Sequence, residues 1–208
     1  MNDLKSLPNP VLNHATLIVM LGNYARPNDK IRNLIAKQEL LPLKRGLYLT
    51  ANLNQSYYEL IANHLYGPSY VSRHWALAYY GLISERVSVV TSMCIGRSRQ
   101  INTSQGLFHY QAIPANYYSV GITSIQQGNI AFMMATPEKA LADLLVSTQY
   151  LRIQSQAAMF DYLENDLRMD VDDLATLDIS KLHSYADKGY KSTMLRQLIK
   201  VIGSLSYD

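Results

Sequence analysis

The stretch LPLKRGLYLT, residues 41–50, decides how the N-terminal part of this chain is interpreted. Two apolar runs flank Lys44, Arg45 and Gly46, which is the pattern of a short β-hairpin with a glycine in its turn. A tight turn often requires a glycine, because glycine accepts a positive φ, but it does not require two cations. Cations at this position are typical of a hairpin tip that neutralises phosphate groups.

The residues before the hairpin predict two helices. Residues 11–22 are apolar enough for a buried helix that ends at Gly22. Residues 29–39 have the period of a second helix. Its apolar side holds Ile31, Leu34 and Ile35, and its opposite side holds Arg32, Asn33, Ala36 and Lys37. Helix, turn, helix and hairpin form the second half of a winged-helix domain, whose second helix enters the major groove. We therefore predict a winged helix-turn-helix domain over residues 1–52.

Charge supports a nucleic-acid contact in this part of the chain. Basic residues outnumber acids between residues 26 and 45, where Arg26, Lys30, Arg32, Lys37, Lys44 and Arg45 oppose Asp29 and Glu39. A solvated helix face and a charged turn that protects a hairpin edge would also explain this patch. A second basic cluster, Arg97 and Arg99, follows Gly96 in a predicted turn. A solvated loop is its simplest explanation, and a second nucleic-acid contact is the alternative.

The remaining sequence predicts a mixed domain over residues 53–208, so the expected fold class is α+β. Helices are expected near residues 53–66 and 73–82, followed by a small central sheet. Its β-rich segments are residues 86–93, 106–113, 117–123 and 129–135. Thr136 and Pro137 are typical of a helix start, with threonine as the N-cap. The C-terminal portion, to about residue 203, is expected to be helical.

Composition narrows the class of protein. Of 208 residues, 48% are hydrophobic and 17% are charged, which is typical of a globular chain. A single cysteine, Cys94, excludes an internal disulfide and a cysteine-rich zinc site. No apolar run reaches the roughly 18 residues that a membrane span requires. The N-terminal residues lack the pattern of a signal peptide, so we expect a cytoplasmic protein without a membrane partner.

Catalytic motifs are not evident. The chain has no phosphate-binding loop, nucleophile elbow or HExxH zinc pair, and its five histidines lack ligand spacing. Glu138, Lys139 and Asp143 have residue types that a metal-dependent nuclease uses. Helix capping and the helix dipole already explain Glu138. We therefore expect no enzyme, no cofactor and no metal, with a nuclease as a remote alternative.

Three motifs together resemble the AbiEi family. They are RG-x-Y (Arg45, Gly46 and Tyr48), YVS…AL…GLI (Tyr70 to Ile83) and PEKAL…DLL (Pro137 to Leu145), and the resemblance spans roughly residues 28–146. The family contains antitoxins and predicted transcriptional regulators of AbiE-type, type IV toxin–antitoxin systems that act in abortive infection, an antiviral defence. Residues 11–22 are more apolar than in the family, which also fits packing on a partner chain.

The resemblance implies a transcriptional autorepressor and antitoxin. Its winged helix would bind inverted repeats in double-stranded DNA of its own promoter. Its C-terminal domain would counteract a nucleotidyltransferase toxin from the same operon without forming a stable complex. The DNA-binding residues implied by position are Lys30, Arg32, Asn33, Lys37, Lys44, Arg45, Gly46 and Tyr48. A winged-helix module that binds protein rather than DNA remains the main alternative.

Overall fold

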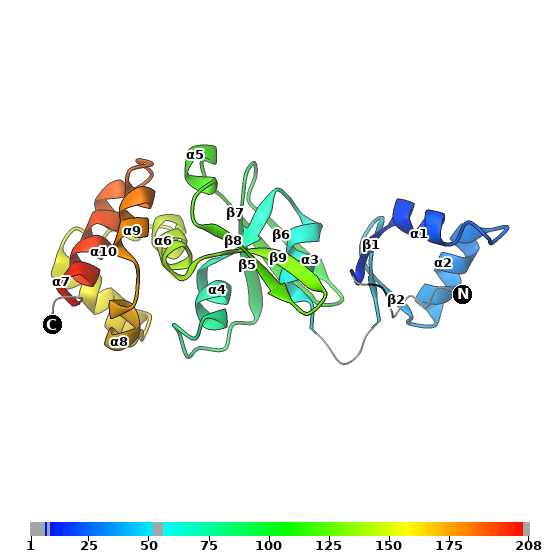
Figure 1. Ribbon diagram of the computed structural model, residues 1–208, viewed down its shortest axis with the longest axis horizontal. Coiled ribbons are helices and arrows are strands. Elements are labelled where there is room, and N and C mark those ends of the chain that lie inside the picture. The colour runs from blue at the N-terminus through cyan, green and yellow to red at the C-terminus, as the bar shows by residue number, and fades with distance from the viewer. Residues whose placement is uncertain (1–6, 8, 52–55, 206–208) are drawn as a thin grey trace.

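The computed structural model describes residues 7, 9–51 and 56–205, and its fold is α+β. Figure 1 shows three blocks along the long axis: an N-terminal unit, a central sheet with its helices, and a C-terminal group of helices. The main core contains buried residues of the central sheet and of the helices packed around it.

The N-terminal unit combines a small sheet with two helices. Its elements are β1 (Val11–Asn13), α1 (His14–Met20), α2 (Pro27–Ala36), β2 (Leu40–Lys44) and β3 (Leu47–Thr50). The strands are antiparallel in the order β1-β3-β2. The helices pack on this sheet through a separate core made of Leu12, Leu17, Leu21, Ile31, Leu34 and Leu40. The unit therefore has its own hydrophobic centre.

The prediction of one helix over residues 11–22 was wrong at its first three residues. Val11 and Leu12 are buried and pair with Leu49 and Tyr48 of the hairpin, so this segment extends the sheet. Asn13 then begins α1, because its side-chain oxygen accepts a hydrogen bond from the backbone N–H of Thr16 at 2.8 Å. Apolar content alone cannot distinguish such a short strand from the first turn of a helix.

The central block contains a mixed sheet. Its elements are α3 (Tyr58–Leu65), β4 (Ser69–Val71), α4 (Arg73–Tyr79), β5 (Val89–Cys94), β6 (Arg99–Thr103), β7 (Gly106–Ala112), α5 (Ala115–Tyr118), β8 (Ile122–Gln127) and β9 (Ile130–Ala135). The strand order is β6-β7-β5-β4-β9-β8. Strands β5 and β7 are parallel, as are β4 and β9, and the other pairs are antiparallel.

The predicted central sheet is confirmed, although three details were wrong. Strand β4 has only three residues, too few to show a periodic pattern. Strand β6 lies at the sheet edge and is largely exposed, so it lacks the apolar alternation that marks a half-buried strand. Residues 115–118 form a helical turn after Pro114 instead of joining a strand, because Pro114 accepts the backbone N–H groups of Tyr117 and Tyr118.

Helix α6 (Pro137–Ser147) lies between the central sheet and the C-terminal helices (Figure 1). Residues 138–146 are all buried, as expected for a helix covered on every side. The predicted cap is confirmed, since the Thr136 side chain accepts a hydrogen bond from the backbone N–H of Lys139. The C-terminal helical elements are α7 (Gln156–Asp161), a π-helical turn (Tyr162–Asp166), α8 (Val171–Ala175), α9 (Ile179–Ala186) and α10 (Ser192–Leu205).

Among the described residues, no helix is both long enough and apolar enough to cross a membrane.

Candidate nucleic-acid interface

Helix α2 presents the predicted polar residues on the side opposite to its buried residues Ile31 and Leu34. Arg32 and Asn33 are exposed, and Lys37 is the exposed C-cap. Lys30 is half-buried, and its ammonium lies 5.2 Å from the ring centroid of Tyr24.

An acidic residue, Asp29, occupies the same exposed surface of α2. Its carboxylate lies 3.3 Å from the Arg32 guanidinium and 3.9 Å from that of Arg26. Residues three and four positions apart are neighbours on a helix, so Asp29 also lies beside Asn33. Exposed ion pairs of this kind contribute about 0–1 kcal/mol, so a phosphate or a base edge can displace Arg32 from Asp29 at low cost. The charge pattern alone did not reveal this pairing.

The predicted hairpin is confirmed, with Arg45 and Gly46 as its two-residue turn. Lys44 pairs with Leu47 across the turn, and Gly46 has a φ of 78°, the left-handed conformation that glycine favours. The Gly46 carbonyl accepts a hydrogen bond of 2.8 Å from the backbone N–H of His14, so the start of α1 supports the turn. Arg45 is exposed at this tip, where its guanidinium is open to solvent.

Tyr48 lies in β3, the central strand of the small sheet, where it pairs with Leu12 of β1 and Pro42 of β2. It is half-buried against the N-terminal core, and its ring centroid lies 6.4 Å from that of His14. Tyr48 therefore supports the hairpin from behind the turn.

Lys44 makes a contact that sequence reasoning did not predict. Its ammonium donates a hydrogen bond to the carbonyl of Leu65, the last residue of α3. A cation at a helix C-terminus satisfies a free carbonyl and complements the helix dipole. The hairpin is thus joined to the central block, and burial together with the Lys44 charge lowers the pKa of nearby His64.

The second basic cluster meets the hairpin at this same end of α3. The Arg99 guanidinium lies 5.2 Å from the ring centroid of Tyr66, the residue after Leu65. The backbone N–H of Arg97 donates to the Tyr66 hydroxyl at 3.5 Å. Both arginine side chains are exposed. Lys44 and residues 97–99, far apart in sequence, therefore meet at the end of α3, and no sequence signal had identified Tyr66.

A further contact holds the two basic clusters together. The Ser104 hydroxyl, in the turn between β6 and β7, donates to the carbonyl of Pro42 in β2 at 3.4 Å. The edge of the central sheet therefore lies against the hairpin.

The residues of the nuclease alternative lie inside the protein. The Lys139 ammonium and the Asp143 carboxylate form an ion pair of 3.1 Å, and both side chains are fully buried. Tyr70 and Ser72 donate hydrogen bonds to Asp143 at 2.9 and 2.7 Å, and Lys139 donates to the Tyr117 carbonyl at 2.9 Å. Burial lowers the pKa of Lys139 and raises that of Asp143, while their mutual attraction opposes both shifts.

Aromatic rings complete the surroundings of Lys139. Its ammonium lies 3.3 Å from the ring centroid of Tyr117, and the rings of Tyr185 and Tyr70 lie at 5.5 and 5.9 Å. Glu138 instead pairs with Lys181 at 3.1 Å, on α9. Among the described residues, no group of three or more His, Cys, Asp or Glu side chains is placed to hold a metal ion. The charged residues of α6 thus contact the central block through Tyr70 and Tyr117 and the C-terminal helices through Tyr185 and Lys181.

Comparison with known proteins adds no assignment. The chain matches no protein-family model, and a comparison with curated protein sequences also gives no match.

Proposed function

We propose that the chain is a cytoplasmic DNA-binding autorepressor that also serves as the antitoxin of a toxin–antitoxin operon. The observation that carries the DNA-binding part is the N-terminal unit, in which a helix with an exposed polar side and a hairpin with a basic turn share one core. The order β1-α1-α2-β2-β3 is the one expected of a winged helix from its first strand onward, which supports the proposal. The antitoxin part rests on the resemblance to the AbiEi family.

In this mechanism α2 enters the major groove of the promoter DNA. Arg32, Asn33 and Lys37 contact base edges, while Lys30 and Arg45 neutralise phosphates. Gly46 permits the turn that presents Arg45, and Tyr48 supports it. Lys44 keeps the hairpin on the central block, so Arg97 and Arg99 extend the basic surface along the flanking DNA backbone.

The test is a gel-shift titration with DNA from upstream of the gene and a scrambled duplex of equal length. Four phosphate contacts, from Lys30, Arg45, Arg97 and Arg99, predict that affinity falls by about two orders of magnitude between about 50 and 200 mM salt. Arg45→Ala should weaken binding to both duplexes alike. Arg32→Ala should reduce the preference for the upstream duplex by about 1–3 kcal/mol if the arginine reads a guanine. Arg196→Ala, an exposed change on α10, is the matched control and should leave both affinities unchanged.

Binding of neither duplex at either salt concentration would contradict the repressor function. Equal effects of Arg32→Ala and Arg45→Ala on both duplexes would contradict the division between base and phosphate contacts.

One observation favours the protein-binding alternative. The side chain of Val19 on α1 is 80% exposed, and Tyr24 beyond the end of α1 is 39% exposed. An exposed apolar surface of this kind suits a protein partner. In that case binding of the protein partner should be insensitive to salt. Val19→Ser should abolish this binding, and Arg45→Ala should leave it unchanged.

A further inference from the structure

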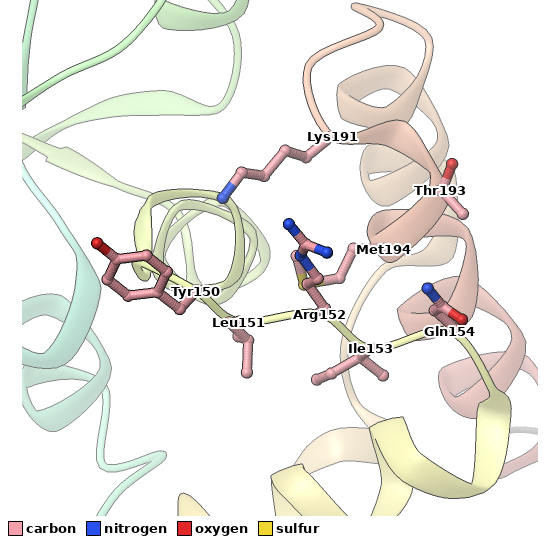
Figure 2. Close-up of a pocket in the computed structure, with 8 residues that line it drawn as sticks. All are labelled: Tyr150, Leu151, Arg152, Ile153, Gln154, Lys191, Thr193 and Met194. Carbon is pink, nitrogen blue, oxygen red and sulfur yellow. The ribbon is translucent and has the colours of Figure 1, made fainter.

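A pocket of about 440 Å³ lies where residues 150–154 pass the start of α10 (Figure 2). This volume is within the range of small-molecule sites, roughly 300–1,000 Å³. Its lining residues are Tyr150, Leu151, Arg152, Ile153, Gln154, Lys191, Thr193 and Met194. None of them belongs to the predicted DNA-binding set, so this pocket is independent of the proposed repressor function.

Two cations give the pocket its charge. The side chains of Arg152 and Lys191 extend toward the same space in Figure 2. Neither forms an ion pair with a carboxylate in the described part of the chain, and the lining includes no acidic residue. Lys191 donates one hydrogen bond, to the Thr148 carbonyl at 3.5 Å, which leaves its other protons available. An anion placed here would satisfy donors that the protein leaves open.

The pocket also has apolar and aromatic lining residues. Ile153 and Met194 are buried, and Leu151 is half-buried. The Tyr150 side chain is 96% exposed, so its ring contributes almost nothing to core packing. An exposed ring that borders the same pocket as two cations leaves its faces open to stack on a planar group.

Backbone strain coincides with this pocket. Tyr150 and Lys191 adopt φ values of 60° and 46°, in the left-handed region that bulky residues rarely occupy. Such conformations persist where the surrounding structure holds them, and they cluster at ligand-binding sites. Here they direct the two side chains that border the pocket.

We propose that the pocket binds a mononucleotide. Its phosphate would lie between Arg152 and Lys191, and its base would stack on Tyr150. The phosphate could belong either to a free nucleotide or to a nucleic-acid backbone, and the small volume together with the exposed ring favours the free nucleotide.

The test is isothermal titration of the full chain with four probes in parallel. They are a panel of ribonucleoside monophosphates, inorganic phosphate, the matching nucleosides and a short DNA duplex. We expect saturable one-to-one binding of at least one monophosphate, tighter than that of inorganic phosphate or its nucleoside. Arg152→Ala should weaken this binding about tenfold or more, because it removes charge-assisted hydrogen bonds. Tyr150→Ala should weaken nucleotide binding and leave phosphate binding unchanged.

Arg196→Ala is the control, since it removes the same charge from an exposed position of α10 outside the pocket. Thermal unfolding of each variant checks that it remains folded. Four outcomes would overturn the proposal: no binding of any monophosphate, equal weakening by Arg152→Ala and Arg196→Ala, equal affinities for nucleotide and phosphate, or loss of duplex binding instead of nucleotide binding in Arg152→Ala.

Discussion

Replacing Asp143 by asparagine tests the buried ion pair of α6 with little change in shape. Asparagine can still accept the hydrogen bonds of Tyr70 and Ser72, but it leaves the Lys139 ammonium without a counter-charge. Breaking one partner of a buried pair typically costs about 3–5 kcal/mol. Lys139 can limit that cost by releasing its proton, which at about pH 7 costs roughly 4.6 kcal/mol for a lysine of ordinary pKa near 10.4. We expect the free energy of unfolding to fall by about 3–4.6 kcal/mol.

The same reasoning predicts a pH signature. A neutral Lys139 in the folded variant means that the unfolded chain binds more protons, so the stability of the variant rises with pH until about pH 10.4. The difference from the natural chain should shrink by about 1.4 kcal/mol for each pH unit between about pH 7 and 9. Urea unfolding followed by the fluorescence of Trp75, the single tryptophan, measures both quantities.

Two further variants serve as controls for this experiment. Lys139→Met combined with Asp143→Leu removes both charges, so it should be less destabilising than Asp143→Asn alone. Lys181→Met breaks the pair with Glu138 from its exposed end, and Glu138 still accepts the backbone N–H of Asp178, so this variant should be less destabilised than Asp143→Asn. A loss below about 1 kcal/mol in Asp143→Asn, or a loss that does not change with pH, would refute the view that Lys139 is a buried cation dependent on Asp143.

Three further predictions concern Gly121, the tyrosines Tyr80 and Tyr185, and Lys44. Gly121→Ala should destabilise the fold by about 2 kcal/mol or more in urea unfolding, because a Cβ there would lie 2.5 Å from the Tyr185 hydroxyl at a φ of 71°; a neutral effect would contradict this packing. The pKa values of Tyr80 and Tyr185 are raised to about 12, mainly by burial, so the folded state retains protons that the unfolded chain releases. The free energy of unfolding should therefore fall between about pH 10 and 12, and an unchanged stability there would argue against it. Lys44→Met loses the bond to the Leu65 carbonyl and should cost about 0.5–1.5 kcal/mol of stability, with a smaller loss of DNA affinity than Arg45→Ala in a gel shift; the reverse ranking would mean that Lys44 contacts DNA directly.

Local patterns predicted the elements whose causes are local. The second helix, the hairpin turn at Gly46 and the start of α6 at Thr136 each depend on residues within a few positions of one another. Strand β1 was missed because its pairing with β3 is a long-range contact. The polar edge strand β6 was missed because exposure removes the alternation that identifies a strand.

In the candidate interface, too, local spacing predicts some features and misses the contacts between distant segments. Helical spacing separates the exposed Arg32 and Asn33 from the buried Ile31 and Leu34. Spacing alone does not reveal that Lys44 reaches the end of α3, or that Tyr66 lies beside Arg99. These contacts join segments that are distant in the chain, and they depend on how the hairpin lies against the central sheet.

The connectivity of the sheets also fixes an order of events during synthesis. The N-terminal sheet pairs residues between Val11 and Thr50, so its strand partners have all emerged early from the ribosome. The pairing of β4 with β9 requires Met134, and the hydrogen bond of Ser72 requires Asp143, 71 positions later in the chain. Contacts between such distant positions form slowly, since a long loop must close first. A nascent chain therefore carries the paired strands of the N-terminal sheet for some time before α6 is synthesised and completes the main core, to which Leu43, Leu47 and Leu49 of the hairpin also belong.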